Sequence, residues 1–237
     1  MKRGVNLETL SWIEAEQWFA SNPVVVIPLG AAAKEHGPHL PLNNDAIIAT
    51  WLAEEIRQRL PVVIAPLINA SYYPAFIEYP GSISLRRETA RDVIVDTCTS
   101  LAGFGLSRFY VINTGLSTLQ PLSAAKKLLN EDIALEYLDL DEALKSLPAG
   151  LLEQRYGSHA DEHETSLMLH IAPEVVNMSL AVDDGADGEG RLTRHQGQGL
   201  WSRSGVFGQA TLATPAKGRV IAQALVEHVL QQLQVLR

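Results

Sequence analysis

An apolar run, VVVIPLG at residues 24–30, is followed after three alanines by the polar sequence KEHGPHLPLNND at residues 34–45. The apolar run is typical of a strand that is buried on both faces of a parallel sheet. In open α/β sheets, ligands bind beyond the carboxyl ends of the strands, so the polar residues that follow this strand are well placed for chemistry. This stretch therefore predicts a parallel sheet with a functional loop at its carboxyl edge.

The rest of the chain alternates strand-like and helix-like segments. Strands are expected at residues 24–29, 62–67, 107–113 and 133–138, and helices at 46–59, 87–103, 119–130, 160–171 and 216–235. Such alternation favours a parallel sheet with helices on both faces. We therefore expect an α/β fold, a single three-layer α/β/α domain with a mostly parallel sheet, over residues 1–237.

The composition argues against several classes of function. The 237 residues carry a formal net charge of −8, which argues against a nucleic-acid partner. The N-terminus lacks the apolar core of a signal peptide, and no apolar run reaches the roughly 18 residues of a bilayer span. We therefore expect a cytoplasmic protein without a membrane partner. The single cysteine, Cys98, is expected to be a buried small side chain rather than a nucleophile.

The loop at residues 34–45 contains side chains of the types that bind metals. His36, His39 and Asp45 offer nitrogen and oxygen donors that suit zinc, manganese or iron, and two prolines restrict the backbone near them. The alternative is a rigid, solvated turn in which Asp45 is the N-cap of the following helix. The spacing alone leaves both interpretations open.

The helix expected at residues 160–171 carries a carboxylate on its apolar face. Glu164 falls in one stripe with Ala160, Leu167 and Met168. A carboxylate is rarely buried unless it is paired or binds a metal. Glu164 is therefore a candidate functional residue, with a buried salt bridge as the alternative.

Two other histidines of this helix are expected to have no catalytic role. His163 and His170 fall on a more polar face, and we expect them to be solvated or to lie in an interface. The pair His159 and His163 has the spacing of a zincin helix, but Ala160 stands at the place of the glutamate in that motif. The zincin interpretation is therefore set aside.

Residues 183–210 are rich in glycine and aspartate, and we expect no regular element there. The region is too polar for a core and too long for an ordinary connection. A mobile lid or an arm between subunits is one interpretation, and a disordered surface loop is the other. Trp201 and Phe207 favour an ordered contact role, because large aromatic side chains anchor pockets and interfaces.

Four segments together resemble the signature of the creatininase family, the creatinine amidohydrolases and their relatives. These segments are HGPHLP at 36–41 with Asp45, PGSISL at 80–85, HADEHETSLML at 159–169, and GVFG at 205–208 with ATPAKG at 213–218. The resemblance runs in family order from about residue 24 to residue 218. It implies a creatininase-like fold, metal ligation by His36 and Asp45, and an active-site His159 that moves protons.

The sequence departs from the family pattern at two places, which marks a divergent subgroup with a KEHGPHLP motif. The family's first glutamate ligand lies two residues before the histidine, where this chain has Lys34. Glu35 comes one residue late and is a candidate catalytic residue or fourth ligand. Gly115 stands where the family has a histidine ligand. The resemblance therefore implies either a single-metal site or a rebuilt pair, and a metal-free relative is the alternative.

The remaining ligands expected from this comparison are His36, Asp45 and Glu164. Lys34 adds a positive charge where a second metal would lie, so it would either exclude that metal or point away from the cleft. A lysine that points inward is a candidate to bind a substrate carboxylate or oxyanion, and a surface lysine is the alternative. His39 is a further candidate for substrate binding.

The resemblance implies a metal-dependent amidohydrolase with zinc, or else manganese or iron, as its cofactor. The metal would activate water, and His159 or Glu35 would move protons during cleavage of a cyclic or formyl C–N amide bond in a small molecule. Tyr72, Tyr73 and Phe76 are candidates for the pocket or for packing. A small-molecule-binding pseudoenzyme on the same fold is the alternative. The family also implies a homo-oligomer, with a hexamer as one form.

Overall fold

The computed structural model describes residues 3–185 and 191–236. It contains a five-stranded sheet in the order β1 (Val5–Asn6), β3 (Val63–Ile64), β2 (Val25–Leu29), β4 (Arg108–Asn113) and β5 (Ala134–Tyr137). Every pair of neighbouring strands in this sheet is parallel. Parallel pairing brings the carboxyl ends of β2 and β4 to the same edge, so the loops that follow them can share a site.

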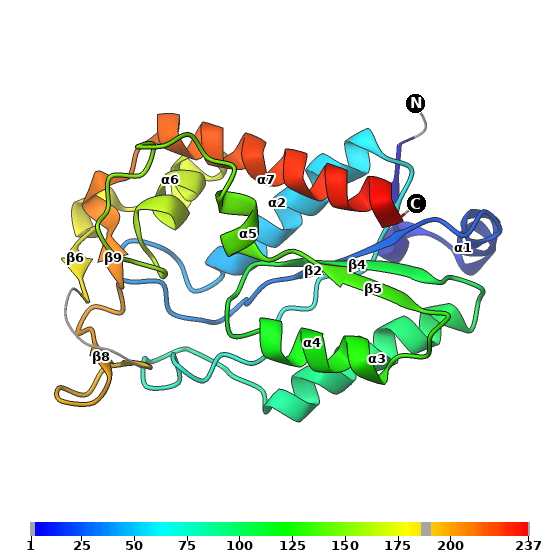
Figure 1. The fold of residues 1–237 in the computed structure, drawn as a ribbon, viewed down its shortest axis with the longest axis horizontal. Helices are drawn as coiled ribbons and strands as arrows, with labels where there is room; N and C mark the ends of the chain where they lie inside the picture. The colour runs from blue at the N-terminus through cyan, green and yellow to red at the C-terminus, as the bar shows by residue number, and fades with distance from the viewer. Residues whose placement is uncertain (1–2, 186–190, 237) are drawn as a thin grey trace.

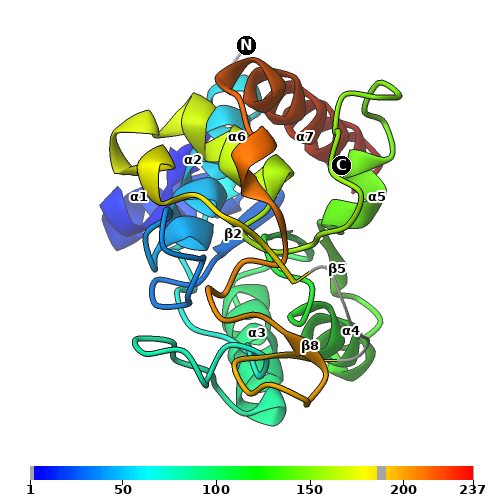
Figure 2. The same ribbon diagram turned by 90° about the vertical axis from the view of Figure 1, so that its left-hand side faces the viewer.

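Helices cover both faces of the sheet (Figure 1, Figure 2). One layer contains α2 (Asn44–Arg59), α5 (Leu140–Leu144), α6 (Glu162–Ile171) and α7 (Pro215–Leu236), and the other contains α3 (Arg87–Ala102) and α4 (Leu119–Leu128).

Successive residues of the central strands point to opposite layers. Val26 and Ile112 belong to the core with α2 and α7, whereas Val25 and Val111 belong to the core with α3 and α4. This alternation is the period of two of a β-strand, and burial on both faces explains why the strand reads as a continuous apolar run. The prediction of a three-layer α/β/α fold is confirmed.

The four predicted strands and five predicted helices are all present, with ends that differ by at most three residues. Three elements of the structure, β1, α5 and α1 (Trp12–Phe19), were not predicted from the sequence. A signal for α1 exists, because Ser11 and Glu14 form a capping box at its start.

The start of α6 differs from the prediction. The helix begins at Glu162, because the Asp161 carboxylate caps it and accepts hydrogen bonds from the backbone N–H groups of His163 and Glu164. Ala160 precedes the helix with φ of 49°, a left-handed conformation that is uncommon for a residue other than glycine. The prediction that Ala160 lies on the apolar face of this helix is therefore wrong.

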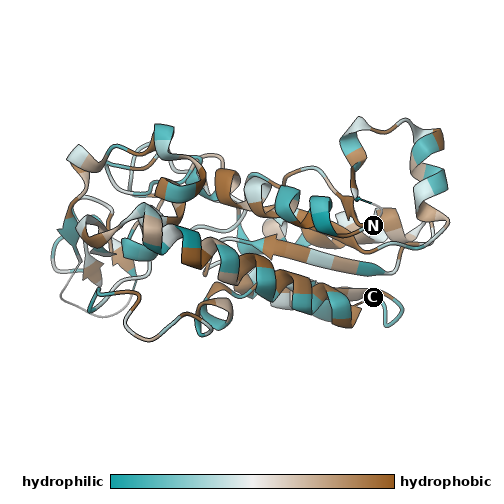
Figure 3. Ribbon diagram, turned by 90° about the horizontal axis from the view of Figure 1, so that it is seen from above, coloured by the Kyte–Doolittle hydropathy of each residue, from teal (hydrophilic) through white to brown (hydrophobic). Residues whose placement is uncertain are grey.

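The C-terminal helix α7 packs closely on α6. Its buried residues form one stripe, Gly218, Ile221, Ala222, Leu225, Val226, Val229 and Leu233. Figure 3 shows hydrophilic and hydrophobic residues interspersed along this helix, which ends at the C-terminus. A Cβ atom at Gly218 would lie 1.8 Å from the carbonyl oxygen of Ser166, so this glycine permits the close approach of the two helices.

The described parts of the region, residues 183–185 and 191–210, contain four two-residue strands, which corrects the expectation of no regular element: β6 (Asp183–Asp184), β7 (Leu192–Thr193), β8 (Leu200–Trp201) and β9 (Gly208–Gln209). It lies at the end of the molecule opposite α1 (Figure 1). Asp184 accepts hydrogen bonds from Ser202 and Ser204, which ties β6 to the chain after β8. Residues 186–190 of the predicted lid or arm lie outside the described residues.

Two smaller expectations can be compared with the structure. Cys98 is fully buried, as predicted, and burial raises the pKa of its thiol to about 12. A thiol in that state is a poor nucleophile. In the described part of the chain, no helix combines the length and apolar character needed to cross a membrane.

Candidate metal centre and active site

A cavity of about 320 Å³ is lined by three of the seven predicted site residues, Lys34, His159 and Glu164. It lies where the loops after β2 and β4 meet the segment that leads into α6. Its lining includes Lys34, Gly115, His159 and Glu164. Residues of the segment at 192–207 close another side, among them Phe207, for which a contact role was expected.

The ring of His36 is held at both nitrogens. Its Nδ1 lies 2.9 Å from the carbonyl oxygen of Lys34, and its Nε2 lies 2.9 Å from Oδ1 of Asp45. A carbonyl oxygen can only accept, so we assign the ring proton to Nδ1. Nε2 faces the carboxylate of Asp45, which also accepts, and a metal ion at Nε2 would take the place of that hydrogen bond, as in many metal-binding histidines whose other nitrogen is hydrogen-bonded.

Asp45 lies in the first turn of α2 and is not its N-cap. The helix α2 starts at Asn44, and the Asp45 carboxylate turns back to the loop, where Oδ2 lies 2.7 Å from Nζ of Lys34. Burial by itself would raise the pKa of this carboxyl, but the Lys34 ammonium and the His36 ring lower it more. Its pKa therefore lies below the ordinary value, and the interpretation of Asp45 as a solvated N-cap is wrong.

His159 lies between two carboxylates. Its Nε2 is 2.9 Å from Oε1 of Glu35, and its Nδ1 is 3.8 Å from Oε2 of Glu164. The imidazole also packs on the ring of Phe76, with centroids 4.3 Å apart. Burial lowers the pKa of His159, but the carboxylate of Glu35 raises it more, so the pKa lies above its ordinary value.

The contact between His159 and Glu35 also shifts the pKa of Glu35, in the opposite direction. Burial raises the pKa of its carboxyl, but His159 and the backbone N–H of Gly37 lower it more, so the pKa lies below its ordinary value. A Cβ atom at Gly205 would come within 2.0 Å of Oε2 of Glu35, and Gly205 has φ of 86°. Glycine is therefore required where residues 202–206 pass this carboxylate.

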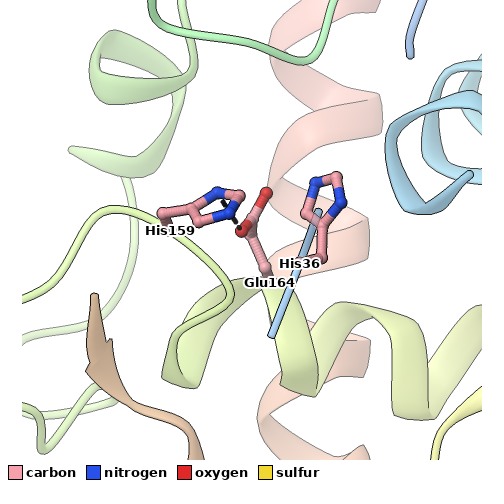
Figure 4. Close-up of side chains that lie close together, drawn as sticks. All are labelled: His36, His159 and Glu164. Carbon is pink, nitrogen blue, oxygen red and sulfur yellow. Dashed lines mark ion pairs between the residues drawn. The ribbon is translucent and has the colours of Figure 1, made fainter. Parts of the chain in front are cut away.

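Three side chains of the site have the arrangement of a metal centre. The ligand atoms of His36, His159 and Glu164 lie within 4.8 Å of one another, and all three residues are buried. Figure 4 shows them converging on one another, with Glu164 between the two rings. Two imidazoles and a carboxylate at this separation suit one divalent metal ion. Within residues 3–185 and 191–236, no other group of three such ligands is found.

This arrangement differs in part from the predicted ligand set. His36 and Glu164 belong to the group, and Asp45 adjoins it through its contact with His36. His159 was predicted to move protons, and it also belongs to this group of possible ligands. Glu35 is not part of the group, but it contacts His159. The roles of these residues stay predictions at this point.

Lys34 points into the protein. It is 3% exposed, and its Nζ lies 4.8 Å from the ring centroid of Phe76 and 5.4 Å from that of Tyr73. The interpretation of Lys34 as a surface lysine is therefore wrong. Gly115 lines the same cavity and, having no side chain, offers no ligand there.

His39 was predicted to bind substrate, but it is held by other contacts. Its Nε2 lies 2.8 Å from Oγ1 of Thr165, and its carbonyl oxygen accepts a hydrogen bond from the backbone of Asn177. It is not among the residues that line the described cavity. Burial lowers the pKa of its imidazole to about 4, so the ring is neutral at pH 7. Its predicted role is not favoured by this placement.

His163 is a cavity residue that the sequence analysis missed. Its Nδ1 lies 2.6 Å from Oδ1 of Asp161, and its side chain is 14% exposed. Burial lowers the pKa of this imidazole, but Asp161 raises it more, to about 9. The interpretation as a solvated residue is wrong for His163, while His170 is exposed as predicted. Asp161 could have indicated this contact in the sequence, because the carboxylate of an N-cap residue lies beside the first turn of its helix, where His163 stands.

The family profile described as creatinine amidohydrolase matches residues 8–233. The chain belongs to the creatininase family. The match covers nearly all of this creatininase-family protein, and it confirms the resemblance drawn from the four sequence segments.

Curated relatives agree with this assignment, and a solved structure shares the fold. The family member is 24% identical to 3-dehydro-scyllo-inosose hydrolase of Thermotoga maritima, over 95% of this chain and 81% of that protein. It is 30% identical to mycofactocin precursor peptide peptidase of Mycobacterium tuberculosis, over 90% of this chain and 86% of that protein. A solved mutant creatininase described as Zn-Zn type has a TM-score of 0.79 at 22% identity, with 98% of each chain covered.

Family membership confirms the prediction of a hydrolase that acts on carbon–nitrogen bonds. It does not favour the alternative of a binding protein that has lost its enzymatic function. The creatininase-like fold is likewise confirmed, because the superposition extends over nearly the entire chain.

Proposed function

We propose that the protein hydrolyses a cyclic or formyl amide bond of a small molecule with the help of one divalent metal. The observation that carries this proposal is the convergence of His36, His159 and Glu164, whose ligand atoms lie within 4.8 Å of one another beside the cavity. His36, Glu164 and Asp45 would hold the ion. When bound, such an ion supplies Lewis acidity that activates water and polarises a carbonyl group.

The pair of His159 and Glu35 is suited to move the proton. The Glu35 carboxylate accepts from Nε2 of His159 at 2.9 Å and so fixes the orientation of the ring. It also favours the protonated imidazole, because a nearby negative charge stabilises a cation in a buried site. In this mechanism His159 takes a proton from the attacking water and delivers it to the leaving nitrogen, which must be protonated before it departs as an amine.

The size of the cavity limits the substrate. A volume of about 320 Å³ lies at the lower end of the range for small-molecule sites. Its walls include the apolar side chains of Leu192, Leu200 and Phe207. These features favour a compact amide with an apolar side. The names of the two curated relatives, a hydrolase of an inosose and a peptidase, make cyclic polyol derivatives and short peptides useful comparison compounds.

Metal analysis and a substrate screen test this function together. The purified protein is treated with chelator, reloaded with zinc or manganese, and assayed against a panel of cyclic amides, formyl amides and short peptides. We expect hydrolysis of at least one cyclic or formyl amide only in the loaded protein. His36→Ala should lose both metal and activity, whereas His170→Ala, which removes an exposed histidine, should keep both.

Two outcomes would contradict the proposed function. The first is a metal content below about a tenth of an equivalent in carefully loaded wild type, because a catalytic site needs far higher occupancy. The second is full metal loading with hydrolysis of peptides alone. Circular dichroism of each variant shows whether a loss of metal reflects the site or unfolding.

Three finer points belong to the same proposal. The imidazole of His36 among the proposed ligands favours zinc over calcium or magnesium, which prefer oxygen ligands. A homo-oligomer, with a hexamer as one form, is part of the proposal as the resemblance to the family implies. The net charge of −8 and the single cysteine are compatible with a cytoplasmic location. Elemental analysis and light scattering at micromolar concentration test the first two points.

A further inference from the structure

Lys34 is a buried cation at the wall of the cavity. Its side chain is 4% exposed, and its Nζ lies 2.7 Å from Oδ2 of Asp45, whose side chain is fully buried. Removing an ammonium group from water costs several kcal/mol, which only a close and well-placed counter-charge offsets. The protein therefore holds this positive charge in place at considerable cost, next to the proposed metal ligands.

Two aromatic rings also lie close to the Lys34 ammonium. The ring of Phe76 lies 4.8 Å from Nζ, and the ring of Tyr73 lies 5.4 Å from it. The faces of aromatic rings attract cations, and more strongly in a desolvated site. Lys34 also lines the cavity together with His159 and Glu164. The ammonium is thus fixed where a bound substrate would meet it.

The same contacts leave no place for a second metal ion on Asp45. Oδ1 of Asp45 faces His36 at 2.9 Å, and Oδ2 is occupied by Lys34. A divalent ion on Oδ2 would lie within a few ångströms of the ammonium, and two positive charges at that distance repel strongly in a site of low dielectric constant.

Other groups near this position do not supply the missing ligands. Gly115 has no side chain, and the hydroxyl group of Thr118 donates to Oδ1 of Asn113. The hydroxyl group of Thr114 donates to the carbonyl oxygen of Leu29 at 3.2 Å. The residues present therefore fit one metal ion but do not fit a pair of the kind named for the solved Zn-Zn relative.

We infer that this site binds a single divalent ion and that the Lys34 ammonium serves as the second cation, donating a hydrogen bond to the carbonyl oxygen of the substrate. An ammonium has three N–H donors, and the pair with Asp45 uses one of them. A fixed donor aimed at an oxygen that gains negative charge during attack lowers the barrier. This inference deepens the proposed function and rests on it.

The first test is the number of metal ions per chain. Chelator-treated wild type is titrated with Zn²⁺ by calorimetry, and the loaded protein is analysed for zinc after desalting. We expect one equivalent. Two tightly bound equivalents with hydrolysis intact would overturn the inference and leave the proposed function standing. Less than about a tenth of an equivalent would overturn both, because no metal site would exist.

The second test removes the charge of Lys34. In Lys34→Met, Asp45 no longer has a competing cation, so we expect Zn²⁺ to bind at least tenfold more tightly than in wild type. The matched control is Lys127→Met, which removes the charge of an exposed lysine and should leave the Zn²⁺ affinity unchanged. A Zn²⁺ affinity that is unchanged or weaker in Lys34→Met would show that Lys34 only stabilises the structure and would overturn the inference.

The third test concerns the carbonyl oxygen. On a substrate that the loaded wild type cleaves, Lys34→Met with full metal content should lose about 100-fold or more in kcat, as is typical for a deleted oxyanion donor. A change confined to KM would contradict the transition-state role. If Lys34→Met does not fold, the zinc stoichiometry of wild type still decides the main point, because it needs no variant.

Discussion

Two segments border the cavity, and they are built in opposite ways. In the segment at residues 34–45, the side chains that carry the chemistry are buried and paired: Lys34, Glu35, His36, His39 and Asp45 are each at most 6% exposed. In the segment at residues 191–209, residues 194–199 are exposed, although Thr193 and Ser202 are buried and hydrogen-bonded to Glu78 and Asp184. Both segments border the same cavity, but a run of solvent-exposed residues lies only in the second.

This difference separates two functions of the site. Burial strengthens the interactions among the charges of the first segment, so the position of each of its groups is set by its partners. The second segment supplies apolar walls, such as Leu192 and Phe207, whose exact identity matters less for chemistry and more for the shape of the substrate. Substitutions in the first segment should therefore abolish function, while those in the second should adjust it.

The largest effect is expected for Asp45→Asn. The variant leaves the Lys34 ammonium buried without its counter-charge, which should destabilise the fold by about 3–5 kcal/mol and remove the bound metal. Urea unfolding of the chelator-treated protein measures the first effect and zinc analysis the second. The double variant Lys34→Met/Asp45→Asn removes both charges and should recover part of the stability. Equal stability of the single variant and wild type would show that the pair is not buried.

The next effect depends on pH and involves His39. Its pKa is about 4 in the folded protein and about 6.5 unfolded, so the unfolded chain takes up a proton first as the pH falls. The ring therefore costs nothing at pH 7, and between pH 6.5 and pH 4 it costs up to about 3 kcal/mol of stability. His39→Gln should lose stability less steeply over this window, measured by urea unfolding of chelator-treated protein. Parallel pH profiles for the two proteins would contradict this.

A substitution at the junction of the two segments should have an intermediate effect. Gly205→Ala places a Cβ atom against Oε2 of Glu35 and forces alanine into φ of 86°, so we expect a loss of about 2 kcal/mol. Displacement of Glu35 also releases His159, which should lower kcat. Gly197→Ala is the matched control, since it shares a positive φ of 83° but would meet no atom within 4 Å. Equal losses in the two variants would attribute the effect to backbone strain alone.

The smallest effect is expected for Glu78→Gln in the contacts that hold the second segment. Glu78 accepts from Arg191 and Thr193, each at 2.7 Å, near the surface. Exposed ion pairs contribute at most about 1 kcal/mol, so global stability should change little. Hydrogen exchange at residues 191–194 should nevertheless accelerate, and KM should rise while kcat stays constant. Glu136→Gln, which breaks a surface pair with Lys126 elsewhere, should change neither quantity.

The elements of the fold were predictable because their signals are local. The run at residues 24–30 is apolar throughout because β2 is buried on both faces. This pattern can be recognised without knowing the rest of the fold. The start of α6 was less predictable, because Asp161 caps the helix and Ala160 takes a left-handed conformation. Short elements such as β1 contain too few residues for a periodic pattern to be recognised.

The candidate site was predictable in its residue types and less so in its contacts. His36 and Glu164 could be singled out by local argument, because one follows a buried strand and the other interrupts an apolar stripe. The position of His159 within reach of His36 could not, since 123 residues separate them in the chain. His163 was misassigned because helical periodicity alone does not show which polar face borders a cavity.

The sequence by itself determined that the chain builds a parallel α/β sheet and carries histidine and carboxylate side chains at its carboxyl edge, because strand burial and residue chemistry are properties of short segments. Only the tertiary structure decided which of those groups meet. It turned Lys34 inward onto Asp45, placed His159 between Glu35 and Glu164, and drew His39 away to Thr165. The physical reason is that electrostatic pairing depends on distance and burial, and both are set by contacts between residues far apart in the chain.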